Sequence, residues 1–295
     1  MLRTLLNATL LPIALFAASC QTAPRHVAGL ESVECIWREA PHSAFTDLLV
    51  VNDRLLCTFR EGDDHVHGRD GTIRVIEHDS DGTWNSVAEL QEDGVDLRDP
   101  KLSLTPDGRV MLTCGGSVYV DRQLQSMATR VAFADPETMD FGPPAPIVVD
   151  DAIASDRDWL WRVTWHEGVG YGVVYQGSKN GVHLLSTKDG VHYSIVTRLP
   201  AEGAPNETTL RFAGDGSMVA LIRREGEDHR ALFGSAKAPF KEWSFSTLPE
   251  AMGGVSVQCG ERGKFGIRLI VTGQKGDRNA GFPAGGCNFV DAIGP

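Results

Sequence analysis

One pattern recurs four times along the chain: two apolar strands joined by a short polar turn. Each copy continues with a third apolar run, a small polar turn that ends in an aromatic residue, and a short last strand. The turns between the first two strands are rich in the Asn, Asp and Gly residues that favour hairpins. The four hairpins span residues 44–62, 97–116, 161–177 and 206–226.

Four strands per copy, repeated about every 45–60 residues, predict a β-propeller. A single four-stranded sheet cannot bury both of its faces, so the copies stack around an axis as blades. The alternative is a β-sandwich of about seven strands, whereas this sequence supplies about sixteen or more. We therefore expect an all-β propeller over residues 44–295. A fifth copy is expected to form strands at 253–258 and 264–273, followed by an irregular stretch at 274–295.

The N-terminus has the layout of an export signal. Arg3 precedes an apolar run at 5–18, and small residues lead up to Cys20. Residues 1–20 are therefore predicted to be a signal peptide, too short for a comfortable membrane span. The small residues are similar to a bacterial lipoprotein signal, which implies lipidation of Cys20; plain cleavage is the alternative. We expect an exported protein, periplasmic or at the cell surface, whose only membrane attachment is this lipid. Residues 21–43 are expected to be a tether and lead-in strand.

The charge balance argues against a nucleic-acid partner. The net charge is 28 − 39 = −11, and phosphate binding requires a basic surface. Cys57 and Cys114 lie in apolar runs and are expected to be buried as small hydrophobic residues. No cofactor and no metal are predicted, although His65 and His67 beside carboxylates leave a metal site as an alternative. The sequence does not specify the oligomeric state.

Two of the small polar turns, at 79–84 and 186–193, combine Asp, Gly and an aromatic residue at similar spacing. The Asp side chain can cap turn amides, Gly allows the tight backbone, and the aromatic ring packs on the blade. These turns resemble degenerate Asp-boxes, the blade-turn motif of sialidases. The resemblance to the sialidase superfamily covers about residues 44–250. It implies a six-bladed type of propeller, here with an incomplete or irregular C-terminal part, and glycoside hydrolase chemistry.

The hairpin at 206–226 matches the family pattern best. Asn206-Glu207, the Asp-Gly turn and Arg223 follow the family's order of a Glu, a turn and an Arg. The resemblance implies that Glu207 is the catalytic base and that Arg223 binds the substrate. An antiparallel hairpin also places Glu207 beside Arg223 or Arg224, so a simple rim salt bridge is the alternative.

The resemblance implies that the catalytic acid lies in the loop before the third strand of the first copy. The family's acidic Asp lies in this loop, and Asp70 is the candidate because it comes just before the strand. Asp63 and Asp64 are the alternatives. If Asp70 and Glu207 act as a carboxylate pair, a separation of about 5–10 Å suits ordinary glycoside hydrolysis.

The arginines are matched only in part. The family's first arginine is expected at 45–47, where there is none. Arg60 reaches the same rim as a substitute, and a solvated strand end before a turn is the alternative. Arg98 and Asp99 begin the second copy where Asn206-Glu207 begin the fourth, and are expected to contact substrate; a local ion pair between the two is the alternative. The equivalent place in the third copy holds Asp158, Trp159, Trp161 and Arg162.

The family's tyrosine nucleophile has no counterpart, because that tyrosine follows the Glu. All four tyrosines here precede Glu207: Tyr119, Tyr171, Tyr175 and Tyr193. A third arginine is also unassigned; Arg262, Arg268 and Arg278 lie in no motif. Two functions remain. One is an exo-α-sialidase-like hydrolase of terminal acidic sugars, with a sialoside-like glycan as substrate. The other is a glycan-binding or scaffold propeller without catalysis.

Overall fold

The computed structural model describes residues 35–66, 68–176 and 181–251, and three further strands at 256–260, 268–272 and 289–292. Side chains are described up to residue 249. The described residues form strands and turns without a helix, which confirms the predicted all-β class. The described residues from Trp37 onward form one compact unit. The predicted signal peptide, Cys20 and most of the tether lie outside the described residues. In the described part, no helix is suited to a membrane span.

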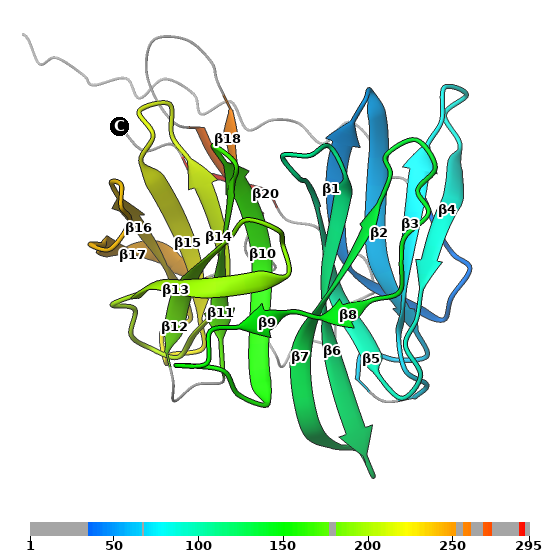
Figure 1. Cartoon of the computed structure of the whole chain (residues 1–295), viewed down its shortest axis with the longest axis horizontal. Coiled ribbons are helices and arrows are strands. Elements are labelled where there is room, and N and C mark those ends of the chain that lie inside the picture. Colours follow the sequence, from blue (N-terminus) through cyan, green and yellow to red (C-terminus); the bar gives the residue numbers. More distant parts are fainter. Residues whose placement is uncertain are drawn as a thin grey trace, which may run out of the picture. The chain divides into compact units, whose positions relative to one another are not determined.

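The strands form successive blades, shown in Figure 1. The first blade comprises β1 (His42–Val51), β2 (Arg54–Gly62), β3 (Thr72–His78) and β4 (Trp84–Leu90). The second comprises β5 (Asp96–Leu104), β6 (Val110–Val120), β7 (Gln123–Ala134) and β8 (Ala145–Pro146). The third comprises β10 (Arg157–His166), β11 (Val169–Tyr175), β12 (Val182–Thr187) and β13 (His192–Arg198), with β9 (Val148–Val149) beside it. The fourth comprises β14 (Pro205–Phe212), β15 (Met218–Arg224), β16 (Arg230–Ala236) and β17 (Ser244–Ala251). A fifth sheet comprises β18 (Ser256–Gly260), β19 (Arg268–Thr272) and β20 (Phe289–Ala292).

Three details differ from the sequence prediction. The short last strand of the second copy is divided: β8 pairs with β7, and β9 pairs in parallel with β13. Prolines at 143, 144 and 146 explain this, because proline cannot donate to a ladder. The hairpin of β6 and β7 also extends to a turn at Asp121 and Arg122, both with positive φ. Finally, β20 lies in the stretch that was expected to be irregular.

The polar turns work as their sequence predicts. Asp79 accepts hydrogen bonds from the amides of Asp81 (3.0 Å) and Thr83 (2.8 Å). In the third blade, Asp189 accepts from the amides of Val191 and His192, both at 2.8 Å. The ring that ends this second turn, Tyr193, is buried. In both turns the Asp side chain therefore caps backbone amides, as the sequence predicts.

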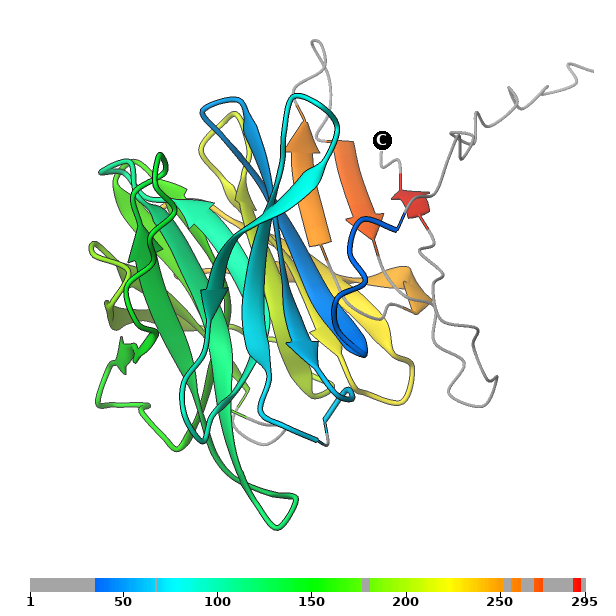
Figure 2. The same cartoon turned by 90° about the vertical axis from the view of Figure 1, so that its right-hand side faces the viewer.

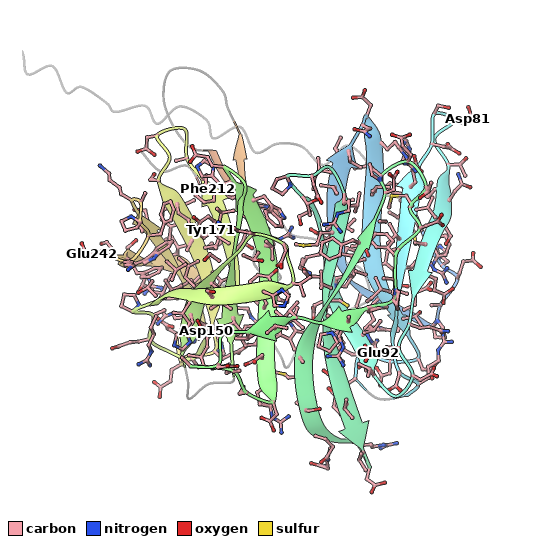
Figure 3. The ribbon with its side chains drawn as sticks, in the orientation of Figure 1. Asp81, Glu92, Asp150, Tyr171, Phe212 and Glu242 are labelled. Atoms are coloured by element: carbon pink, nitrogen blue, oxygen red, sulfur yellow. The ribbon has the colours of Figure 1, made fainter. Side chains whose placement is uncertain are left out.

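Apolar clusters fill the space between neighbouring blades. In β6, Leu112 packs with the first blade and Met111 with the third. In β11, Val174 faces the second blade, while Val173 faces the fourth. This alternation is the period of two expected for a strand buried on both faces. Tyr171 and Phe212, labelled in Figure 3, extend the third interface, with ring centroids 5.7 Å apart.

The first strand of each blade contacts the first strand of the next. The contacts run from β1 to β5, from β5 to β10, from β10 to β14 and from β14 to β18 (Figures 1 and 2). Residues near the start of these strands can therefore meet across blade boundaries. This arrangement positions the candidate site.

Candidate active site

Each of the first four blades has the same β-bulge in its first strand. In β1, two residues lie between the pairs Ala44↔Arg60 and Asp47↔Thr58, opposite a single residue of β2. The ladders of β5, β10 and β14 with their second strands shift in the same way. A bulge bends the strand and redirects its side chains. The bulged residues are Phe45 and Thr46, Asp99 and Pro100, Trp161 and Arg162, and Asn206 and Glu207.

Glu207 has the properties of a catalytic carboxyl group. Its Oε1 accepts a hydrogen bond of 2.7 Å from Arg223, as the hairpin geometry predicted. Its Oε2 is buried and has no hydrogen-bond partner in the described part of the chain. The pKa of Glu207 is raised to about 7: burial, the largest cause, and the charge of Asp99 raise it, whereas Arg223 and Lys101 lower it. Such a group exchanges a proton near neutral pH, as a general acid or base must.

Asp99 is the carboxylate that acts on Glu207. It has a left-handed backbone, with φ of 51°, which costs a non-glycine residue roughly 1–3 kcal/mol. Burial raises the pKa of Asp99, while the charges of Lys101 and Arg98 oppose that rise. Strain of this kind persists only where surrounding contacts impose it, and it is concentrated at functional sites. The bulge thus brings Asp99 into the environment of Glu207.

Lys101 follows the same bulge and is only 5% exposed. Its Nζ lies 4.4 Å from the centroid of the Trp161 ring, in the bulge of the third blade. Burial lowers the pKa of Lys101, and the negative charges of Asp99, Asp47 and Glu207 raise it. A lysine between carboxylates was not identified from the sequence. Its only signal was a charged residue at the head of the apolar run of β5.

Asp47 and Arg162 form a buried ion pair between the first and third blades. Both terminal nitrogens of Arg162 donate to the Asp47 carboxylate. Asp47 also accepts a hydrogen bond of 2.9 Å from the amide of Leu102 in the second blade. This single carboxylate therefore ties three blades together beside Lys101.

The arginines expected to bind a substrate carboxylate already have partners in the chain. Arg60 is 1% exposed and donates to Asp96 at 2.8 Å. Arg223 lies between Glu207 and Glu225. Arg98 pairs with Asp96 at 3.0 Å and lies over the Phe45 ring. The local ion pair of Arg98 with Asp99 is therefore replaced by one with Asp96.

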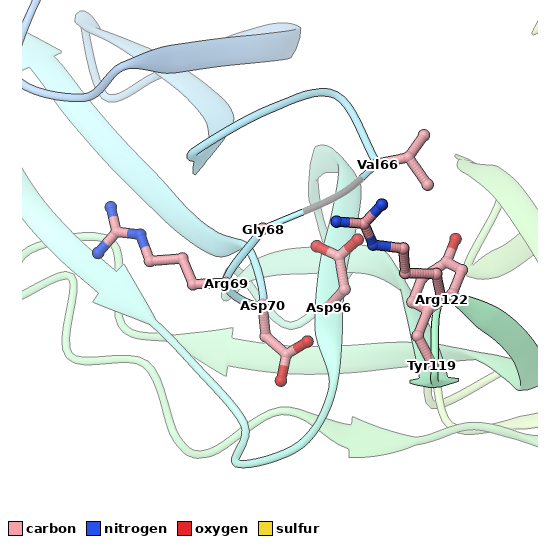
Figure 4. A pocket seen from close by; sticks show the side chains of 7 residues that line it. All are labelled: Val66, Gly68, Arg69, Asp70, Asp96, Tyr119 and Arg122. Carbon is pink, nitrogen blue, oxygen red and sulfur yellow. The ribbon is translucent and has the colours of Figure 1, made fainter.

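Asp70 lies in a cluster with Asp96. It lines a pocket of about 180 Å³ together with Asp96, Tyr119 and Arg122 (Figure 4). Burial and the charge of Asp96 raise the pKa of Asp70, and Arg60 lowers it. The structure therefore groups Glu207 with Asp99 and groups Asp70 with Asp96.

The described residues do not assemble the ligands of the alternative metal site. His65 contacts the rings of His42 and Phe45, and His67 lies outside the described residues. Burial and the charge of Arg98 lower the pKa of His65. Among the described residues, no group of three or more metal-ligating side chains occurs.

Tyr175 lies near Glu207 although it precedes it in the sequence. Burial holds the pKa of Tyr175 well above its usual range, and the charges of Glu207 and Asp99 raise it further. Its ring stacks on Trp159, with centroids 6.3 Å apart. The hydroxyl therefore stays protonated at neutral pH. The linear order of the motif did not reveal it, because its position depends on the packing of the third blade against the fourth.

No protein-family model and no curated protein matches the sequence. Solved structures do match the fold. A protein of unknown function from Dyadobacter fermentans superposes with a TM-score of 0.66 at 13% identity, over 79% of this chain and 75% of that chain. The NanB sialidase from Streptococcus pneumoniae gives 0.63 at 8% identity, over 81% of this chain and 58% of that one. The GH93 α-L-arabinofuranosidase of Fusarium graminearum gives 0.60 at 14%, over 81% and 76%.

These likenesses confirm the predicted all-β fold of four-stranded blades. It is the fold of propeller-type glycosidases, a sialidase among them. Identities of 8–14% establish a common fold and not a common activity.

Proposed function

We propose that this protein is a glycoside hydrolase that removes a terminal sugar from a glycan, with Glu207 and Asp99 as its two reacting carboxyl groups. The observation that carries the proposal is the Glu207 carboxyl group, whose pKa is raised to about 7 and whose Oε2 is buried without a partner among the described residues. A carboxyl group in this condition can donate a proton to a glycosidic oxygen. Asp99 is the candidate for the second carboxylate in place of Asp70.

The roles of the pair follow from their neighbours. Glu207 in its acid form would protonate the departing sugar oxygen. Asp99 has Lys101 and Arg98 nearby, and both favour its ionised form. An ionised Asp99 would stabilise the positive charge that develops on the sugar ring or activate the attacking water.

The site supports a neutral terminal sugar better than an acidic one. Arg60, Arg98 and Arg223 are each ion-paired with carboxylates of the chain. A substrate carboxylate would have to compete with those partners. The second candidate is the sialidase-like action on an acidic sugar. It is favoured by Arg98, whose ion pair with Asp96 is made through one terminal nitrogen, Nη1.

A panel of fluorogenic glycosides tests the function. Purified protein is assayed with α-sialosides, α-L-arabinofuranosides, β-galactosides and β-xylosides. We expect turnover of a neutral glycoside; turnover of the sialoside alone selects the second candidate. Binding on a glycan array without turnover of any substrate would reject the enzyme and leave a glycan-binding propeller.

The choice between Asp99 and Asp70 is tested by matched substitutions. Asp99→Asn is expected to lower kcat by about 10²-fold or more, because it removes a reacting carboxylate. Asp70→Asn is expected to change kcat less than about threefold, since Asp70 lies in the neighbouring cluster. Steady-state kinetics on the best substrate measure both. The reverse ranking would return the acid to Asp70.

We further propose that the protein is exported and lipidated at Cys20, on the support of the sequence layout of residues 1–20. Metabolic labelling with a fatty acid in a bacterial host tests this. Label is expected in the wild-type protein and in Cys35→Ser, and is expected to be absent from Cys20→Ser. Label that persists in Cys20→Ser would contradict lipidation at this residue.

A further inference from the structure

We propose that Lys101 is a positioning residue of this site: its ammonium group holds the β5 bulge that carries Asp99 and supplies the positive charge shared by Asp99 and Glu207. The catalytic role of Lys101 rests on the proposed function. The coupling of two carboxyl groups by its cation does not depend on turnover and can be measured without a substrate.

The contacts of the ammonium group are made with the bulge itself. Nζ donates to the backbone carbonyl of Pro100 at 3.1 Å and to that of Asp99 at 3.4 Å. These are the two bulged residues of β5, which lie opposite a single residue of β6. Bulged residues are left out of the regular ladder, so their carbonyls need other donors. Lys101 thereby helps to hold Asp99 in its left-handed conformation.

The same group joins two blades. Trp161 is a bulged residue of β10, and its ring faces the Lys101 ammonium at 4.4 Å. A cation is attracted to the electron-rich face of an indole ring, and the attraction is stronger where both are desolvated. The bulges of the second and third blades are therefore tied at one point, next to the carboxyl groups of the site.

The charges around Lys101 come from four blades. Asp47 of β1, Asp99 of β5 and Glu207 of β14 favour its ammonium form, and Arg162 of β10 opposes it. Glu207 in turn faces Arg223, Asp99, Lys101 and the hydroxyl of Tyr175. Asp99 faces Lys101, Arg98, His65 and Arg60. Among the described residues, Lys101 is a cation that acts on both carboxyl groups.

This sharing has a consequence for protonation. Two buried carboxyl groups that repel each other tend to keep their protons. A cation next to both makes ionisation of one of them less costly. Lys101 therefore lowers the pKa of both Asp99 and Glu207, against the rise that burial causes in each.

The experiment compares Lys101→Met and Lys101→Gln with the wild-type protein. Lys188→Met is the control, because Lys188 is exposed on the third blade. Carboxyl carbons labelled with ¹³C are titrated by NMR. We expect the pKa of Glu207 to rise by at least one unit in both Lys101 variants and to be unchanged in the control. Unchanged pKa values in the Lys101 variants would overturn the proposal.

Kinetics and a wild-type measurement complete the test. In the active enzyme, both limbs of the pH profile of kcat/KM are expected to shift to higher pH in Lys101→Gln, because both carboxyl groups lose the same cation. Lys101→Gln keeps an N–H donor for the bulge carbonyls, which separates the loss of charge from the loss of a contact. If neither variant folds, the ¹⁵N shift of Lys101 in the wild-type protein decides. This shift is expected to change over the same pH range in which Glu207 titrates. A shift that does not change in that range would overturn the proposal.

An inactive wild-type protein whose Glu207 still titrates with Lys101 would reject the glycosidase and keep the coupling. An active enzyme in which Glu207 titrates independently of Lys101 would keep the glycosidase and reject the coupling. The two failures are therefore distinguishable.

Discussion

Replacing Glu207 with glutamine is expected to lower kcat/KM by about 10³-fold, because the site loses the group that exchanges a proton near neutral pH. Glutamine has nearly the same shape and can still contact Arg223. Activity of the wild-type protein is expected to fall as pH rises through about 7, where Glu207 gives up its proton. A profile of kcat/KM against pH, with the variant assayed beside it, measures both effects.

The same substitution is expected to stabilise the fold at high pH. Glu207 keeps its proton in the folded protein up to about pH 7, whereas the ordinary pKa in the unfolded chain is 4.5. Between these values the folded state binds more protons, so wild-type stability falls as pH rises. The cost of ionising Glu207 is on the order of 3 kcal/mol above pH 7. Glu207→Gln avoids this cost, so its advantage in denaturant unfolding should be present at pH 8 and absent at pH 4.

Glu225→Gln is the matched control, because Glu225 is the second carboxylate paired with Arg223. It is expected to keep most of the activity and to lack the pH-dependent gain. If Glu207→Gln retained more than a tenth of wild-type activity, or if the control lost as much, Glu207 would be a structural salt bridge rather than a catalytic group.

Removing the guanidinium group of Arg162 is expected to produce the largest loss of stability. Arg162→Leu leaves Asp47 as a buried, unpaired charge, and breaking a buried pair in this way costs about 3–5 kcal/mol. The side chains of the pair are only 10% and 9% exposed. Because Asp47 also binds the amide of Leu102, the contact joins three blades. Chemical denaturation followed by tryptophan fluorescence measures the loss.

Two further variants serve as comparisons for Arg162→Leu. Arg109→Leu breaks the exposed pair with Asp107 and is expected to change stability by less than about 1 kcal/mol. The double variant Asp47→Leu with Arg162→Leu removes both charges and is expected to be more stable than Arg162→Leu alone. An Arg162→Leu protein as stable as Arg109→Leu would show that the pair contributes nothing to holding the blades together.

Local features were predictable because their causes are local. In the turns at Asp79 and Asp189, the Asp side chain caps backbone amides that lie two to four residues further along the chain. The pairing of Glu207 with Arg223 follows from a hairpin that spans fewer than about twenty residues. Arg224, one residue further on, pairs instead with Asp228, as alternation along a strand requires.

The sequence by itself therefore determined the all-β class, the succession of four-stranded blades and the hairpin of Glu207 and Arg223. Only the tertiary structure decided that the charge of Asp99 acts on Glu207, that Arg60 is enclosed with Asp96, and that Lys101 and Tyr175 lie near Glu207. The physical reason is twofold. A bulge moves a strand's register by one residue without a local sequence signal, and neighbours across blades come from the packing of strands far apart in the chain.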